Sequence, residues 1–188
     1  RSVGGLSFPL QDHSQDDDDA LDRAVQIRRH DRGEVQNVVD EAQDQDAYDG
    51  VRRAIDLGLS YVDTSPLYGQ SERRVGLALE GGYREKVYLQ TKTGTHPERR
   101  HDYSAEATRW SVENSLRQLR TEYIDSVLIH DPREEDDPFE TGAGWDELVK
   151  MKDEGLIGHI GIGIRSSKWQ KVAIESDCVA NHVKRSCS

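Results

Sequence analysis

The chain has 188 residues and a formal net charge of −11, with 36 acidic residues against 25 Lys and Arg. This length suffices for one domain with a sizeable core. An acidic chain is repelled by nucleic-acid phosphates and by anionic membrane surfaces, and no run approaches the roughly 18 apolar residues of a membrane span. We therefore expect no nucleic-acid partner and no membrane insertion.

The N-terminal part differs in composition from the rest of the chain. Residues 1–10 contain a possible first strand at 3–8, and residues 11–46 are rich in Asp, Gln and Arg, which predicts a disordered or weakly helical insert. The chain starts at Arg1, and its only methionine is Met151. From these features, we expect the chain to be a fragment of a longer protein.

The C-terminal residues 178–188 form a polar tail that carries both cysteines, Cys178 and Cys187. One pair so close in sequence is a weak disulfide signal, and two free thiols are typical of a cytoplasmic protein. We expect a cytoplasmic location on this basis.

Between these ends, residues 47–177 alternate strand and helix patterns. Gly58, Gly81-Gly82 and Gly155 mark helix ends, while Ser71 and Ser104 are expected to cap helices. The strands are expected at 59–64, 87–91, 126–129 and 160–164, and the helices at 47–57, from 71, from 104, around 145–155 and at 167–175. Such alternation predicts a parallel sheet covered by helices.

Two closures of a parallel sheet are possible, an open doubly wound sheet and a closed barrel. An open nucleotide-binding sheet normally carries a G-x-G-x-x-G turn after its first strand. Gly161 and Gly163 instead lie within a late strand, without a third glycine at that spacing. We therefore expect an α/β fold of the (β/α)8 TIM-barrel type. A complete barrel typically needs about 250 residues, so this chain would form a partial barrel of about five βα units.

Polar side chains stand at or just after the ends of three of these strands. They are Asp63, Lys92 and His130, and Tyr68 follows Asp63 by five residues. Strand ends of this kind line the active site of a βα barrel. The Lys92 ammonium would favour the phenolate of Tyr68, Asp63 would hold the ammonium, and His130 would hydrogen-bond a carbonyl oxygen. This set suits proton transfer coupled to hydride transfer from a nicotinamide.

Other interpretations of these residues exist. Each one alone is an ordinary cap, loop or turn residue. A metal-dependent barrel using His130, Asp131 and Asp63 is a further alternative. No second histidine stands at ligand spacing, and the Lys92 ammonium would oppose a cation. We therefore expect no metal.

Several stretches resemble the aldo-keto reductase family, and the resemblance covers roughly residues 47–176. They are DTSPLYGQSE at 63–72, TKTG at 91–94, YIDSVLIHDP at 123–132, the passage 148–157 and IGIG at 160–163. The resemblance implies NADP or NAD as the cofactor, with Tyr68 as the general acid/base, Lys92 and Asp63 tuning it, and His130 orienting a sugar or other carbonyl substrate. It also places Asp63 and Ser166 on the cofactor side.

Finer details resemble the aldose dehydrogenase branch of that family, of the L-galactose and D-threo-aldose type, which oxidises an aldose to its lactone. These details are residues 130–132, 102–104 and 163–166. Two departures stand out. Arg165 and Ser166 occupy places where the family often has Ser-Asn, whose Asn contacts the nicotinamide.

The second departure is that nothing after Asp177 resembles the last three strands of the family. The resemblance therefore implies weak cofactor binding, low stability and a tendency to associate. A non-catalytic binding or regulatory subunit, or an inactive fragment, is the alternative function.

Overall fold

The computed structural model describes the backbone of residues 32–175 and the side chains of residues 43–175. By its internal contacts the chain divides into Arg1–Asp44 and Gln45–Ser188. The expected strand at 3–8, the remainder of the insert up to residue 31, and the tail with Cys178 and Cys187 lie outside the described residues. Within the described part, no helix is both long enough and apolar enough to cross a bilayer.

Four parallel strands form one sheet in the order β1-β2-β3-β4. They are β1 (Tyr61–Asp63), β2 (Tyr88–Thr93), β3 (Ile124–His130) and β4 (Ile157–Gly163). Strand order follows chain order, so each strand pairs with the next through one helical crossover, as a βα barrel requires.

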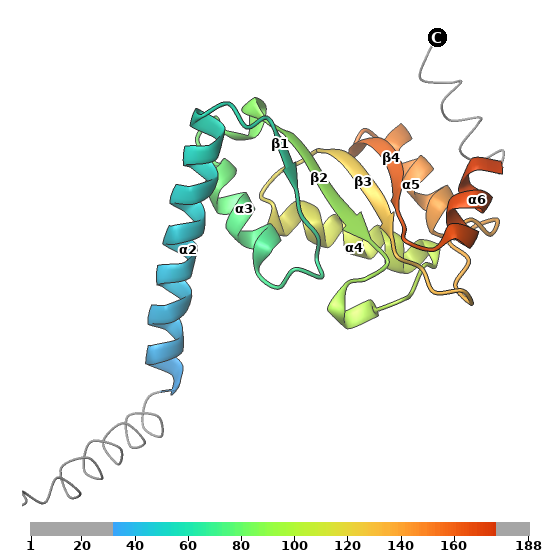
Figure 1. The fold of residues 1–188 in the computed structure, drawn as a ribbon, viewed down its shortest axis with the longest axis horizontal. Coiled ribbons are helices and arrows are strands. Elements are labelled where there is room, and N and C mark those ends of the chain that lie inside the picture. The colour runs from blue at the N-terminus through green and yellow to red at the C-terminus, as the bar shows by residue number, and fades with distance from the viewer. Residues whose placement is uncertain (1–31, 176–188) are drawn as a thin grey trace, which may run out of the picture. The chain divides into compact units, whose positions relative to one another are not determined.

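Helices connect these strands and follow the last one (Figure 1). They are α2 (Arg32–Asp56), α3 (Ser71–Leu79), α4 (Ala105–Gln118), α5 (Gly144–Asp153) and α6 (Ser167–Glu175), with short 3-10 turns at Arg84–Lys86 and Pro97–Arg99. The expected class, α/β with a partial βα barrel, is confirmed. Four βα units lie in the described residues, and the strand expected at 3–8 lies outside them.

The core lies between one face of the sheet and its covering helices. Leu89 and Val127 from the strands, and Val112, Leu148 and Met151 from α4 and α5, are fully buried. Burying side chains of this size supplies about 1.5–3 kcal/mol each. The apolar spacing in α4 and α5 therefore fixes which side of each helix faces the sheet.

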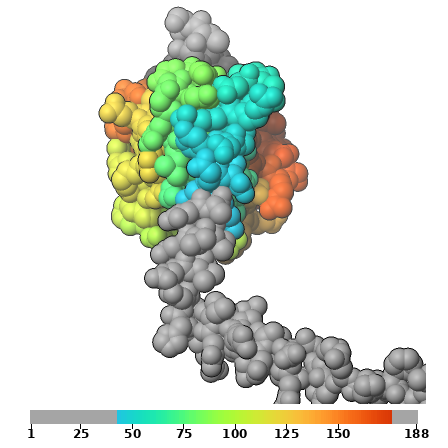
Figure 2. All heavy atoms as spheres, turned by 90° about the vertical axis from the view of Figure 1, so that its left-hand side faces the viewer, coloured from blue at the N-terminus to red at the C-terminus, as the bar shows by residue number. Residues whose placement is uncertain are grey.

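The C-terminal part of α2 packs against α3. Arg52 Nε donates to the carbonyl oxygen of Ala78 over 3.0 Å, and its Nη2 donates to that of Glu80 over 2.6 Å. Figure 2 shows this part of α2 on the surface that faces the viewer. Two carbonyl groups at the end of α3, which have no partner within that helix, are thereby satisfied.

The helix before β1 is longer than the apolar pattern predicts. It begins at Arg32, not near residue 47. The described part of the 11–46 segment, which was expected to be either disordered or weakly helical, is therefore helical. The segment contains no proline, and Glu, Gln and Ala favour helix even where the apolar periodicity is weak.

The two serines expected to cap helices have different roles. Ser104 caps α4 by accepting from the amide of Ala107 over 3.2 Å, as expected. Ser71 is the first residue of α3 and caps nothing, because its hydroxyl accepts from Thr64 Oγ1 over 2.9 Å. That bond ties the start of α3 to the end of β1, so the Ser71 cap prediction was wrong.

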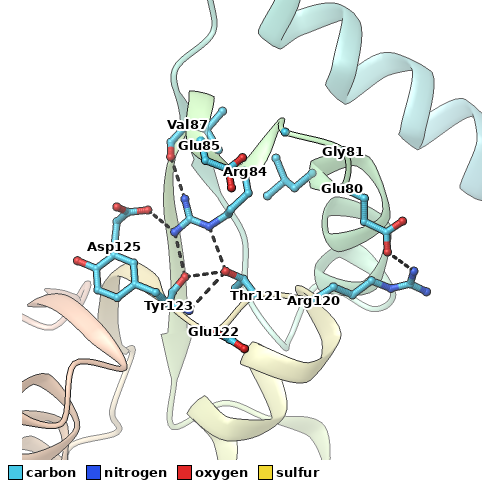
Figure 3. Close-up of a pocket in the computed structure, with 12 residues that line it drawn as sticks. Glu80, Gly81, Arg84, Glu85, Val87, Arg120, Thr121, Glu122, Tyr123 and Asp125 are labelled. Carbon is cyan, nitrogen blue, oxygen red and sulfur yellow. Dashed lines mark hydrogen bonds and ion pairs between the residues drawn. The ribbon is translucent and has the colours of Figure 1, made fainter.

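A hollow of about 610 Å³ lies at the N-terminal ends of β2 and β3, and Arg84 crosses it (Figure 3). Its guanidinium donates to the carbonyl oxygens of Val87 and Tyr123, to Thr121 Oγ1, and to the Asp125 carboxylate over 2.7 Å. The Asp125 carboxylate also accepts from the amide of Leu89. This end of the sheet is therefore held by one arginine whose hydrogen bonds are made within the protein.

We predict that Arg84→Gln lowers the free energy of unfolding by about 2–4 kcal/mol, since several partly buried acceptors lose a charged donor. The matched control is Arg120→Gln in the same hollow. Within the described residues, the Arg120 side chain makes only an exposed ion pair with Glu80, and such pairs contribute about 0–1 kcal/mol. Urea unfolding followed by circular dichroism measures both. Equal effects of the two substitutions would contradict the role given to Arg84.

Candidate active site

The four residues singled out by the sequence lie at the C-terminal ends of neighbouring parallel strands. Asp63 is the last residue of β1, Lys92 lies one residue before the end of β2, and His130 is the last residue of β3. Tyr68 lies in the loop between β1 and α3, where its amide donates to Ser65 O over 3.0 Å. Because parallel strands end at the same edge, the fold brings these residues to one place.

The Lys92 ammonium is almost completely buried and fully paired. Its Nζ donates to Asp63 Oδ1 over 2.8 Å and Oδ2 over 2.7 Å, and to the carbonyl oxygen of Thr64 over 2.9 Å. Gln90 Nε2 donates to Asp63 Oδ1 as well. An unpaired buried charge costs several kcal/mol. The Asp63 carboxylate offsets this cost and so stabilises the Lys92 ammonium inside the protein.

Tyr68 stands over this ion pair with its ring half exposed. Lys92 Nζ lies 5.0 Å from the centroid of the Tyr68 ring. The His130 ring meets the same aromatic ring edge-on at a centroid distance of 6.3 Å. A phenol, an ammonium, a carboxylate and an imidazole therefore share one site that is open to a ligand on the tyrosine side.

His130 is held at one nitrogen and desolvated. Its Nδ1 lies 2.8 Å from Thr95 Oγ1, a hydrogen-bond distance. Burial lowers the pKa of His130, the charges of Lys92 and Arg165 lower it further, and Asp131 opposes them. The imidazole is therefore neutral at pH 7, and its Nε2 remains for a ligand oxygen, because Asp131 Oδ2 is 3.9 Å away.

The backbone under His130 depends on a close contact. Tyr103 Oη donates to the carbonyl oxygen of His130 over 2.6 Å. The Tyr103 ring passes so near Gly94 that a Cβ there would lie 2.0 Å from Cε1, and Gly94 also has a φ of 90°. Only glycine fits this position, which explains the glycine after Thr91-Lys92-Thr93.

Asp131 joins the loops that follow β3 and β4. Its Oδ1 accepts from the Arg165 amide over 2.9 Å, and its Oδ2 accepts from Arg165 Nε over 2.7 Å. Asp131 has a φ of 40°, a left-handed conformation that Asp tolerates better than most residues. Ser166 follows directly after Arg165 and lines a hollow of about 380 Å³ together with His130 and Thr95.

The alternative metal set of His130, Asp131 and Asp63 lacks a free Asp63 carboxylate in this site. The Asp63 carboxylate is occupied by Lys92, and His130 Nε2 and Asp131 Oδ2 are 3.9 Å apart. In the part of the chain that the structure describes, no group of three or more His, Cys, Asp or Glu side chains is placed to hold a metal ion.

Sequence reasoning missed three supporting residues. Thr95 and Tyr103 hold His130, and Glu72 is buried between helix and sheet, where it accepts from Thr91 Oγ1 over 2.6 Å. Burial raises the pKa of Glu72, against hydrogen bonds from Thr91 and Ser115. The available signal was position, because Thr95 follows the strand that carries Lys92 and Glu72 ends the 63–72 motif.

The fold and this site define an α/β protein with a polar constellation at the mouth of a partial βα barrel. A sequence profile described as the aldo/keto reductase family matches residues 33–186. The chain therefore belongs to the aldo/keto reductase family, whose members are oxidoreductases. The family expected from the sequence motifs is thereby confirmed.

Individual relatives agree with this assignment. The chain is 29% identical over 154 residues to D-threo-aldose 1-dehydrogenase from Pseudomonas sp, covering 69% of this chain and 47% of that protein. It is 35% identical over 131 residues to L-galactose dehydrogenase from Arabidopsis thaliana, covering 63% and 38%. The chain thus spans less than half the length of these curated relatives.

A solved structure shares the same architecture. An aldo/keto reductase from Klebsiella pneumoniae, in complex with NADP and acetate, is 31% identical with a TM-score of 0.59. The match covers 73% of this chain and 46% of that one. The four-stranded sheet therefore corresponds to part of a larger barrel.

We predict that Asp131→Asn lowers the pKa of His130 further, because Asp131 supplies the largest charge that raises it. An asparagine fits the left-handed backbone equally well. Titration of the His130 ring protons by NMR measures the shift, and Asp153→Asn on α5 is the control. An unchanged or higher pKa in Asp131→Asn would contradict the prediction.

A stability consequence follows from the same pKa. The unfolded histidine takes up its proton near about 6.5, whereas the folded one does so at lower pH. The contribution of His130 to stability is therefore lost as the pH falls from about 6.5 through the folded pKa.

Proposed function

We propose that this chain carries the acid/base site of a cytoplasmic NAD(P)-dependent oxidoreductase that interconverts a carbonyl and an alcohol. The finer proposal is oxidation of an aldose at its anomeric carbon to the lactone. One observation carries it: the Lys92 ammonium, fixed by Asp63, lies 5.0 Å from the ring of the half-exposed Tyr68.

In this proposal Tyr68 is the general acid/base. Its ring lies beside the Lys92 ammonium, and during oxidation Tyr68 takes the proton from the anomeric hydroxyl. In the reverse direction the phenol returns that proton to the alkoxide as it forms. Asp63 keeps the amine charged and in place, so it acts through Lys92 and not on the substrate.

His130 orients the reacting oxygen. The ring is neutral at pH 7, and one nitrogen is bonded to Thr95, so Nε2 can donate to the carbonyl oxygen when its partner nitrogen accepts from the threonine. A neutral donor polarises the carbonyl without delivering a proton in competition with Tyr68. The proton thus has one route, through the phenol.

The residues present fit the nicotinamide end of the cofactor. When bound, a nicotinamide supplies or accepts the hydride at the carbonyl carbon. Ser166 would offer its hydroxyl to the carboxamide, since it lines the same hollow as His130, and Asp63 would lie on the cofactor side of Lys92. The NADP in the Klebsiella pneumoniae relative supports this choice.

The sugar substrate rests on two relatives of similar sequence. They are named D-threo-aldose 1-dehydrogenase and L-galactose dehydrogenase, and both names describe oxidation of an aldose. The alternative function is a non-catalytic binding or regulatory subunit, and the turnover measurement below distinguishes the two.

We predict that Tyr68→Phe lowers the turnover of L-galactose by at least about a hundredfold, because it removes the general acid/base. Absorbance of the reduced cofactor at high protein concentration measures the rate, with NAD and NADP in parallel. Fluorescence titration with NADPH is expected to show equal cofactor affinity in both proteins. Tyr123→Phe is the control, as Tyr123 directly precedes the first residue of β3, at the opposite edge of the sheet from Tyr68.

Two outcomes would overturn this proposal. Turnover that persists in Tyr68→Phe would remove the phenol from the mechanism. NADPH binding without turnover of any tested carbonyl, in the unsubstituted chain, would favour the non-catalytic binding subunit.

A further inference from the structure

The hollow beside His130 is rich in hydrogen-bond donors. Loops after four successive strands line it, and three of these loops contribute one arginine each, at positions 100, 133 and 165. The whole chain carries a net charge of −11. Three arginines around one hollow are therefore unusual for so acidic a chain.

Two of the three arginines keep donors available. Arg133 is engaged by Asp136 and Glu135, each at 3.3 Å from its Nε. Arg165 uses only Nε in its pair with Asp131, and 89% of its side chain is exposed. Arg100 is exposed and makes no hydrogen bond or ion pair within residues 43–175.

The carboxylate acceptors of the same hollow are already used. Among the described residues that line it, Asp131 is the only carboxylate, and both oxygens accept from Arg165. A neutral sugar needs acceptors for its hydroxyl protons, and these residues offer none on a carboxylate. A ligand that brings its own acceptors and a negative charge matches the surplus of donors.

We propose that the substrate bears an anionic oxygen group, a carboxylate or phosphate, which Arg100 and the outer nitrogens of Arg165 bind while the carbonyl end reaches His130 and Tyr68. This inference rests on the proposed function and narrows its substrate class to acidic aldoses or other acidic carbonyl compounds. A guanidinium fork matches two oxygens of such a group.

The site is also placed to select substrates by charge. Lys92 is matched by Asp63, so the charge at the floor of the site is balanced. Among the described residues of the hollow, Arg100 is the arginine without a carboxylate partner; its charge attracts anions during approach, and salt weakens that attraction. Selection at the rim leaves the acid/base chemistry at the floor unaffected.

The test compares D-galacturonate with D-galactose, which differ at carbon 6 in a carboxylate against a hydroxymethyl group. Binding to the 188-residue chain is measured by NMR titration without cofactor, following the His130 ring and the Arg165 Nε proton. We expect galacturonate to bind at least about tenfold more tightly than galactose, and less tightly as NaCl is raised.

Arg100→Gln is expected to weaken galacturonate binding by roughly tenfold to a hundredfold and to leave galactose unchanged. The matched control is its neighbour, Arg99→Gln. Arg99 pairs with Glu106 and stacks on Trp110, outside the hollow. Arg100→Lys is expected to restore part of the preference, because it keeps the charge but not the planar fork.

Three outcomes would overturn the inference. They are equal binding of the two sugars, an equal loss in Arg99→Gln, and a loss of NADPH affinity in Arg100→Gln with no change for galacturonate. The last would assign the anionic oxygen to the cofactor. None of these depends on turnover, so they are distinguishable from a failure of Tyr68→Phe to abolish activity.

Discussion

The ion pair between Lys92 and Asp63 is the constraint on which the site depends. An ammonium group that is almost wholly buried requires a carboxylate, and Asp63 meets it with both oxygens. The two residues belong to adjacent strands, so the pair forms only where β1 and β2 run parallel in their observed register. The same contact fixes the amine beside the ring of Tyr68, so the pairing of the two strands determines where the ammonium lies relative to that phenol.

The sequence predicted the parts of this arrangement that are local. The alternation of apolar strands with capped helices indicated parallel pairing, and residues at strand ends must then share an edge. Asp63, Lys92 and His130 were recognised in this way, as was Tyr68 in the adjoining loop. The start of α2 was not, because its first turns lack the apolar periodicity that marked the other helices.

The contacts that the sequence did not predict join residues far apart in the chain. Asp131 pairs with Arg165, and Arg84 pairs with Asp125. No sequence motif predicts either ion pair. The support of His130 by Thr95 and Tyr103 likewise requires the loop after β2 to fold back over β3. The register of a sheet indicates which strand ends are neighbours, whereas the course of each loop decides which of its side chains meet.

The hydrogen bonds of the Arg84 guanidinium bear on how the sequence of this protein can change in evolution. The guanidinium holds the N-terminal ends of β2 and β3, at the edge of the sheet opposite Asp63, Lys92 and His130, through backbone carbonyls that exist whatever side chains are present. The loops after the C-terminal strand ends can therefore change in sequence without weakening the sheet that carries them. In this architecture, one edge of the sheet can change its ligand preference while the opposite edge maintains the stability of the fold.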